Sequence, residues 1–188
     1  MSIYFVRHGQ TDWNLHGKMQ GHTDIELNDT GRQQALIAKE KLADVQMDFI
    51  YASPLSRAKE TASIINENWD LPIVVDERLC ERSFGEYEGH SSDGLDYSKL
   101  WKLCEEPPFP GAENSIAFYQ RVEAFLDTII EQAQEKNILI VAHGGVSIPY
   151  YCYFHGYEFE NLNEVLLGNC EVSRMDGKKY SCKQEASV

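Results

Sequence analysis

The chain has 188 residues, of which 43% are hydrophobic and 25% are charged, close to the averages of globular proteins. This length fits one domain, or one domain with a small insertion, and the composition excludes a disordered chain. The 17 basic and 30 acidic residues give a net charge of −13. Such a charge argues against nucleic-acid or membrane binding through general attraction, so an anionic ligand needs a local basic cluster.

The sequence also bears on the cell compartment. No basic stretch precedes the short apolar run at the N-terminus, and no apolar segment is long enough to span a bilayer, so we expect neither a signal peptide nor a membrane helix. The cysteines are odd in number, form no C-x-x-C pair and are widely scattered: Cys80, Cys104, Cys152, Cys170 and Cys182. This usage argues against a disulfide framework or a zinc site, and it favours a reducing, cytoplasmic compartment.

Short apolar runs alternate with longer helical patterns, which predicts an α/β fold. The runs expected to form strands are residues 3–6, 49–52, 73–75 and 138–142, with a last edge strand at 170–175. Continuous β-branched runs are typical of strands buried on both faces of a parallel sheet. We therefore expect a mainly parallel central sheet.

Helical periodicity occupies the spaces between these runs, at residues 30–42, 53–68, 115–134 and 146–154. Asn28 or Asp29 is expected to cap the first helix. Ser53 and Pro54 are expected to open the second, because Ser caps helices and Pro suits the first helical position. The apolar stripes expected on the first three helices are Ala35, Leu36, Lys39 and Leu42; Ala58, Thr61, Ala62 and Ile65; and Tyr119, Val122, Leu126, Ile129, Ile130 and Ala133.

The segment 86–114 departs from this alternation because it is rich in residues that interrupt regular structure, namely Gly89, Gly94, Pro107, Pro108, Pro110 and Gly111. No linker separates two halves of the chain. We interpret the segment as a small cap inserted into a single domain that covers residues 1–188, and we expect it to fold over the sheet.

Charged side chains follow several of the predicted strands directly. Arg7 and His8 follow the first, Arg57 lies in the helix turn after the second, and His143 follows the fourth. In open α/β sheets ligands bind beyond the carboxyl ends of the strands, so these residues are expected to meet. Guanidinium groups match phosphate oxygens, and a neutral imidazole is a competent nucleophile toward phosphorus. The pattern predicts a phosphoryl-transfer site that needs no metal.

Departure of an alcohol from phosphorus also needs a proton donor. Glu81 follows the third strand and can reach the same edge, where it would act as an acid and then as a base toward water. Backbone N–H groups at the helix that opens after Gly145 would add donors. Each feature has a plainer interpretation: a core histidine, a solvated Arg57, or a surface ion pair between Glu81 and Arg82. Their ordered convergence favours the functional interpretation.

Five blocks in consistent order resemble the signature of the histidine phosphatase superfamily, also called the phosphoglycerate mutase-like family. The resemblance runs from about residue 3 to residue 173 and is closest to the phosphatase branch with alpha-ribazole phosphatase and broad-specificity phosphatases. The blocks are residues 7–14 (RHGQTDWN), 21–35 (beginning GHTDIEL), 53–62 (SPLSRA with Thr61 and Ala62), 81–89 (Glu81, Phe84-Gly85 and Glu88-Gly89) and 141–145 (VAHGG).

This resemblance implies a role for each candidate residue. His8 would be the phosphorylated nucleophile, Glu81 the proton donor and acceptor, and Arg7, Arg57 and His143 the groups that hold the phosphoryl group. The resemblance further implies a three-layer α/β/α sandwich, a small phosphorylated substrate, and no cofactor or metal. The residues it matches to further substrate contacts are Asn14, Gln20, Gly21 and Gly144; Gln20 stands where mutase relatives commonly carry Thr.

The expected activity is that of an acid-type phosphatase that hydrolyses monoesters through a phosphohistidine and prefers acidic to neutral pH. A phosphoglycerate mutase and a non-catalytic phosphate-binding module are the alternatives. Residues 86–115 carry two lysines, Lys99 and Lys102, against seven carboxylates, a net charge of 2 − 7 = −5 that is expected to repel a second anionic group. Four aromatic residues there would suit a neutral leaving group or simply anchor the cap: Tyr87, Tyr97, Trp101 and Phe109.

The remaining histidines and aromatic residues have a structural interpretation. His16, His22, His90 and His155 show no metal-ligand spacing. The run 149–154 is expected to be a packed helix rather than a ligand cage.

Overall fold

The computed structural model describes residues 2–96, 100–156, 165–176 and 179–180. Within them a five-stranded sheet has the order β3-β2-β4-β1-β5. The strands are β1 (Ile3–Arg7), β2 (Phe49–Ala52), β3 (Ile73–Val75), β4 (Ile138–Ala142) and β5 (Val172–Met175). The first four pair in parallel and β5 pairs antiparallel with β1, which confirms the predicted α/β fold with a mainly parallel sheet.

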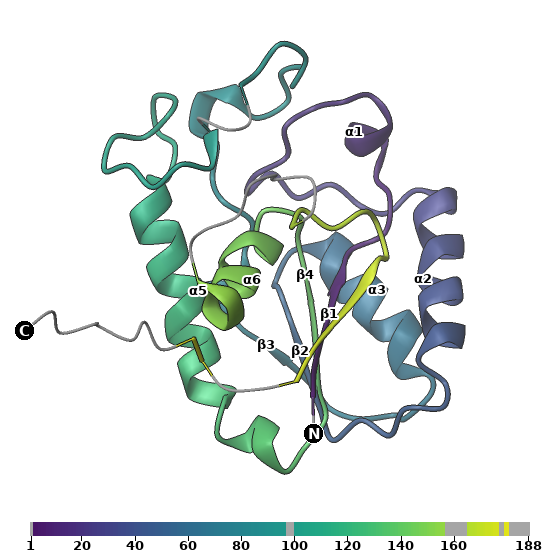
Figure 1. Cartoon of the computed structure of the whole chain (residues 1–188). Helices are drawn as coiled ribbons and strands as arrows, with labels where there is room; N and C mark the ends of the chain where they lie inside the picture. The colour runs from purple at the N-terminus through teal and green to yellow at the C-terminus, as the bar shows by residue number, and fades with distance from the viewer. Residues whose placement is uncertain (1, 97–99, 157–164, 177–178, 181–188) are drawn as a thin grey trace, which may run out of the picture.

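Helices cover both faces of this sheet (Figure 1). One face carries α2 (Asp29–Lys41) and α3 (Ser56–Asn66), and the other carries α5 (Ser115–Ile129) and α6 (Ser147–His155). The short elements are α1 (Asp12–Leu15) and the 3₁₀ turns η1 (Glu77–Leu79), η2 (Gly85–Tyr87) and η3 (Gln132–Gln134). This is the expected three-layer arrangement.

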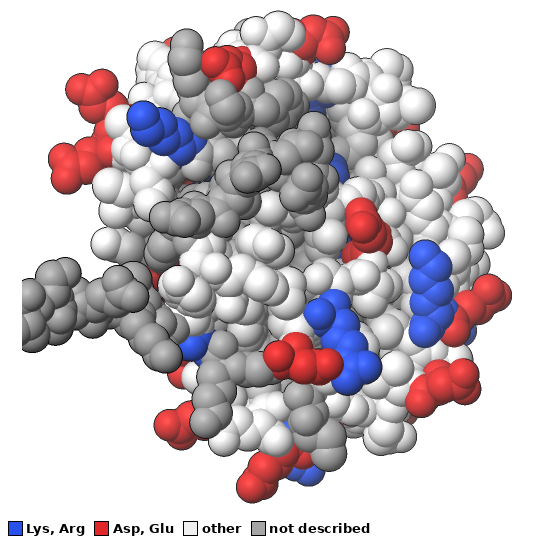
Figure 2. Space-filling model, in the orientation of Figure 1, with Lys and Arg blue, Asp and Glu red and all other residues white. Residues whose placement is uncertain are grey.

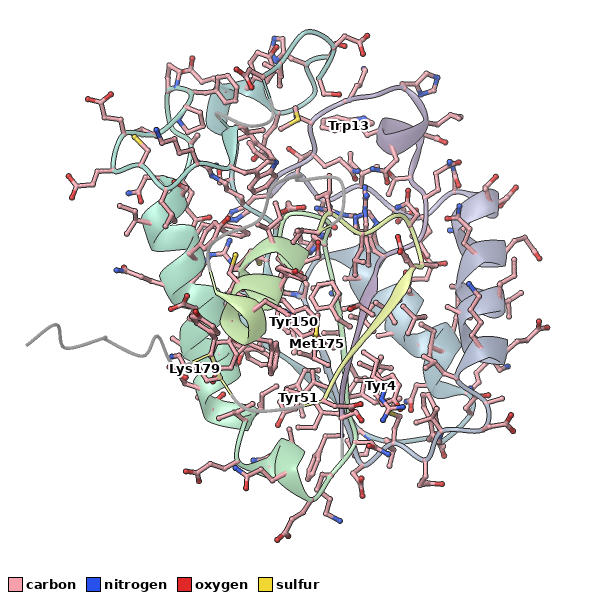
Figure 3. All side chains as sticks on the ribbon, viewed as in Figure 1. Tyr4, Trp13, Tyr51, Tyr150, Met175 and Lys179 are labelled. Carbon is pink, nitrogen blue, oxygen red and sulfur yellow. The ribbon has the colours of Figure 1, made fainter. Side chains whose placement is uncertain are left out.

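Two hydrophobic cores form because alternate residues of a strand point to opposite faces. Phe5 and Ile140 enter the core under α5 and α6, whereas Val6 and Val141 enter the core under α2 and α3. Tyr150 of α6 lies against the sheet (Figure 3), with its ring 4.9 Å from that of Phe5 and its hydroxyl donating to the Ile3 carbonyl at 3.0 Å. The predicted packed helix at 149–154 is thus confirmed.

The sheet and the first helix differ in detail from the expectation. The predicted cap Asn28 accepts a hydrogen bond from the Gly31 N–H at 2.9 Å, so α2 begins as expected. Leu36, however, is 38% exposed, because α2 packs through its small residues Gly31, Ala35 and Ala38. The residues of β3 are likewise not buried on both faces, because this strand lies at the edge of the sheet.

The two later helices also have other bounds than expected. Ser53 does not open α3: its N–H continues the sheet ladder to the Val141 carbonyl, and the helix begins at Ser56 after an N-cap at Leu55. The helix predicted to reach residue 134 ends at Ile129 and continues as η3. Near that end the Thr128 hydroxyl donates to the Phe125 carbonyl, a local bond that competes with helical ones.

The described part of segment 86–114 lies beyond the carboxyl ends of the parallel strands (Figure 1). Tyr97, Lys99 and Cys182 lie outside the described residues. Arg82 forms no surface pair with Glu81: its side chain is buried and donates to the carbonyls of Leu100 and Glu113.

The surface and the helices bear on the expectations about binding partners. On the face drawn in Figure 2, acidic side chains lie at many points of the rim and also near the centre, interspersed with the visible basic side chains. No helix within the described ranges combines the length and the apolar character needed to cross a membrane.

Candidate active site

The pairing of β1, β4 and β2 brings three separated segments to one edge of the sheet. Arg7 lies opposite Ala142 in the parallel pair β1–β4. The ladder continues beyond the strands, since the His8 N–H donates to the Ala142 carbonyl at 2.9 Å and the Ser53 N–H donates to the Val141 carbonyl at 3.0 Å. The residues that follow the three strands therefore leave the sheet side by side.

A cavity of about 340 Å³ opens at this edge. It is lined by the predicted residues Arg7, His8, Asn14, Gln20, Gly21, Arg57, Glu81 and Gly144. His143 is the exception: it is fully buried and does not line the cavity, although its ring centroid is 5.1 Å from that of His8. The structure thus brings the predicted residues together and places His143 behind them.

Hydrogen bonds fix the orientation of His8. Its Nδ1 lies 2.7 Å from the Gly9 carbonyl, which can only accept, so Nδ1 carries the proton and Nε2 keeps a free lone pair. The backbone is also anchored: the Asn169 side chain donates to the His8 carbonyl at 2.9 Å, and the Gly9 N–H donates to the Thr61 hydroxyl at 3.1 Å. Nε2 of His8 is therefore the nitrogen available as a nucleophile.

Burial and neighbouring charge keep this imidazole neutral. Burial is the largest cause that lowers the pKa of His8 well below its ordinary value of 6.5, and the positive charges of Arg57 and Arg7 lower it further. A neutral imidazole is the form that can attack phosphorus. The same site thus holds a neutral nucleophile and two cations.

Arg57 is fully buried, and three of its five N–H groups bond within the protein. Nη1 and Nη2 donate to the carbonyls of Thr23 and Gly21, each at 2.8 Å, and Nε donates to Nδ1 of His143 at 3.3 Å. Burial lowers the pKa of Arg57 to about 10, so the group is charged at neutral pH. Two N–H groups remain for a ligand.

His143 is held between Arg57 and Ser53. Because Nδ1 accepts from Arg57, Nε2 carries the proton and donates to the Ser53 hydroxyl at 2.7 Å. Burial is again the main cause that lowers the pKa of His143 well below 6.5, followed by the charge of Arg57.

Two glycines after β4 leave room for the charged groups. A side chain on Gly144 would contact the Arg7 guanidinium, whose Nη1 donates to the Leu167 carbonyl at 2.8 Å. A side chain on Gly145 would overlap the Glu81 carboxylate. The Gly145 N–H donates to Glu81 at 3.0 Å, and the Arg82 N–H donates to its other oxygen at 2.9 Å. The predicted amide donor at Gly145 therefore orients Glu81.

Sequence reasoning did not find several residues of the site. Lys18 and Ser92 line the cavity, Ser53 supports His143, and Asn169 anchors His8. Asn169 lies just before β5, at the same edge as the other site residues, so its position was the available signal. Lys18 and Ser92 lie on loops whose path the sequence does not specify. Among the described residues, no group of three His, Cys, Asp or Glu could hold a metal ion.

Comparison with known proteins identifies the family. The model of the histidine phosphatase superfamily (branch 1) matches residues 3–187. The chain belongs to this superfamily. It is 41% identical over 169 residues to a Bacillus subtilis protein named uncharacterized phosphatase PhoE, covering 90% of this chain and 85% of that one. It is 37% identical over 194 residues to phosphoglycerate mutase-like protein 4 of Arabidopsis thaliana, covering 95% and 82%.

A solved structure supports this family assignment. Mycobacterial glucosyl-3-phosphoglycerate phosphatase, in complex with VO3, superposes on this histidine phosphatase with a TM-score of 0.81 and 28% identity, covering 93% of this chain and 92% of that one. The named relatives support a phosphatase function, and the superfamily also includes mutase-like proteins.

The two buried histidines predict an acid-sensitive fold. Below pH 6.5 the unfolded chain protonates both imidazoles while the folded histidine phosphatase does not, so the free energy of unfolding should fall with pH. Each histidine contributes at most about 1.4 kcal/mol per pH unit. Urea titrations between pH 7.5 and 5.5 should show that the free energy of unfolding changes less steeply with pH in His8→Ala than in the wild type. An unaltered slope in His8→Ala would contradict this prediction.

Proposed function

We propose that this protein hydrolyses phosphate monoesters through a phosphohistidine on Nε2 of His8, without a metal. The observation that carries the proposal is the free Nε2 of a neutral, buried imidazole in a cavity that is also lined by Arg7, Arg57 and Glu81. Nε2 attacks phosphorus and the phosphorus–oxygen bond breaks, while Glu81 gives its proton to the departing alkoxide. Water then attacks phosphorus, Glu81 takes a proton from it, and the phosphorus–nitrogen bond breaks.

The charges around His8 suit this chemistry. The guanidinium groups of Arg7 and Arg57 neutralise the equatorial oxygens of the phosphoryl group in the transition state. His143 would act from behind Arg57: its Nδ1 accepts from Arg57 Nε and so helps to hold this guanidinium toward the phosphoryl group. The neutral imidazole and protonated Glu81 that the first step requires are the reason we expect a preference for acidic to neutral pH, as in an acid-type phosphatase.

The preference for hydrolysis over mutase activity rests on the cavity rather than on the net charge of the cap. The cap contributes Ser92 and Trp101 to the lining, and no basic residue from its described part lines the cavity. The expected repulsion by cap carboxylates is not supported, because none of them lines the cavity: Glu88 binds the backbone of residues 22–23, and Glu113 pairs with Arg121.

A third cation, Lys18, also lines the cavity. Its ammonium lies 5.8 Å from the centroid of the Trp13 ring and has no carboxylate within ion-pair distance among the described residues. We propose that the substrate alcohol carries an anionic group that Lys18 binds. The names of two relatives, a phosphoglycerate mutase-like protein and a glucosyl-3-phosphoglycerate phosphatase, agree with this proposal.

Two broader proposals accompany the activity. Residues 1–188 would act as one domain, with segment 86–114 covering the site. The four described cysteines are free, which supports a reducing compartment, and we propose the cytoplasm.

The test is release of inorganic phosphate from a panel of monoesters in excess EDTA. We expect turnover to persist, to be faster for esters that carry a carboxylate than for neutral alkyl phosphates, and to exceed interconversion of 2- and 3-phosphoglycerate with 2,3-bisphosphoglycerate present. Loss of activity that Mg²⁺ restores would contradict metal independence. Efficient interconversion with little phosphate release would favour the mutase, and binding without any turnover would favour the non-catalytic module.

A further inference from the structure

Glu88 of the cap is held by five hydrogen bonds. Oε1 accepts from the N–H groups of His22 and Phe84 at 3.0 and 3.1 Å and from the Ser83 hydroxyl at 3.4 Å. Oε2 accepts from the N–H and the hydroxyl of Thr23 at 2.8 and 2.5 Å. Burial acts to raise the pKa of Glu88, but these donors outweigh it and lower the pKa below its ordinary value of 4.5. The carboxylate is therefore ionised at neutral pH.

The loop that Glu88 binds also binds Arg57. The N–H groups of His22 and Thr23 donate to Glu88, whereas the carbonyls of Gly21 and Thr23 accept from Arg57, each at 2.8 Å. Residues 21–23 thus lie between a carboxylate of the cap and the guanidinium of the phosphoryl site. Gly21 has a φ of +53°, and a side chain there would overlap the Glu88 carboxylate. The close approach of Glu88 therefore requires glycine.

We propose that Glu88 is a positioning residue that orients Arg57 through residues 21–23, so that the cap sets the geometry of phosphoryl binding. The inference rests on the proposed function, because Arg57 is assigned there as a phosphoryl ligand. Without Glu88, the two carbonyls that fix Nη1 and Nη2 would lose their support on the cap side. The loop would stay attached through Asp24, which accepts from the N–H and the hydroxyl of Ser56, both at 2.7 Å.

The cap offers a matched control. Glu86 lies two residues away, is exposed and is not among the residues that line the cavity. Glu88→Gln is the conservative variant: its single amide oxygen can accept from only part of the set of donors, so it should rescue part of the effect of Glu88→Ala.

The experiment measures binding of inorganic phosphate by calorimetry, which needs no turnover. We expect Glu88→Ala to weaken binding at least about tenfold, Glu88→Gln to weaken it less, and Glu86→Ala to change it less than about twofold. In an Arg57→Ala background, Glu88→Ala should weaken phosphate binding further by less than about twofold, because the group that Glu88 positions is gone.

Two results would overturn the inference: unchanged phosphate binding in Glu88→Ala, or equal losses with and without Arg57. If Glu88→Ala does not fold, Glu88→Gln is measured in its place, alone and combined with Arg57→Ala. Unchanged phosphate binding, or equal losses with and without Arg57, would again overturn the inference. A wild-type protein that binds phosphate but hydrolyses no ester would refute the proposed function. The phosphate affinities of the variants would still test the role of Glu88 in that case.

Discussion

His8→Ala is expected to lower kcat for hydrolysis of p-nitrophenyl phosphate by at least about 10⁴-fold, because removal of a covalent nucleophile leaves only binding and charge stabilisation. The cavity and the two guanidinium groups remain, so inorganic phosphate should still bind. Initial rates of phosphate release and calorimetric titration with phosphate measure the two properties separately.

His155→Ala is the control for this variant, because His155 is exposed and lies at the far end of α6. Its activity should match that of the wild type. A His8→Ala protein that retains most of its turnover would show that the phosphoryl group passes directly to water or to another side chain.

Glu81→Gln should affect the hydrolysis of alkyl and aryl phosphates to different extents. An alkoxide needs a proton as it departs, whereas p-nitrophenolate is weakly basic and leaves without one. Loss of the acid should therefore lower kcat/KM for an alkyl phosphate by about 10²- to 10⁴-fold and should change kcat/KM for p-nitrophenyl phosphate far less. For the aryl ester, kcat should still fall, because Glu81 also serves as the base toward water.

The side-chain amide that Glu81→Gln introduces can still accept a hydrogen bond from the Gly145 N–H, so the variant keeps much of the local geometry. Exposed Glu86→Gln is the matched control and should leave both substrates unaffected. Equal losses of kcat/KM for the alkyl and aryl esters would assign Glu81 a role in shaping the site instead of in proton transfer.

The sequence was sufficient to predict the sheet and much of the cavity. The apolar runs predict β1, β2 and β4, and parallel pairing requires their carboxyl ends to share an edge. Arg7 and His8 follow their strand directly, so their position depends on the register of strands more than on a loop. Arg57 is fixed almost as firmly, because it lies in the first turn of a helix that packs on the sheet.

The groups that support these residues could not be predicted, because they depend on how loops fold over the edge. Lys18, Glu88 and Asn169 come from three loops with no periodic pattern, and their partners are backbone groups in several cases. The preference of Ser before Pro predicts a helix cap at Ser53, but its hydroxyl binds His143 instead.

Net charge was equally a poor guide to the cap. The charge count predicts that the cap carboxylates act on the substrate, yet Glu88 and Glu113 bond within the protein and none of the described ones lines the cavity. A net charge does not say which side chains point into the cavity, and only those side chains contact a ligand.

The most direct test of the central claim is to trap the phosphoenzyme. Protein mixed with a ³²P-labelled monoester and quenched in alkali within one turnover should carry label that is stable in base and lost in acid, as a phosphoramidate on histidine is. Peptide mapping should place this label on His8, and His8→Ala should carry none. Label on another residue, or rapid phosphate release from wild-type protein that never carries label, would contradict the proposed mechanism.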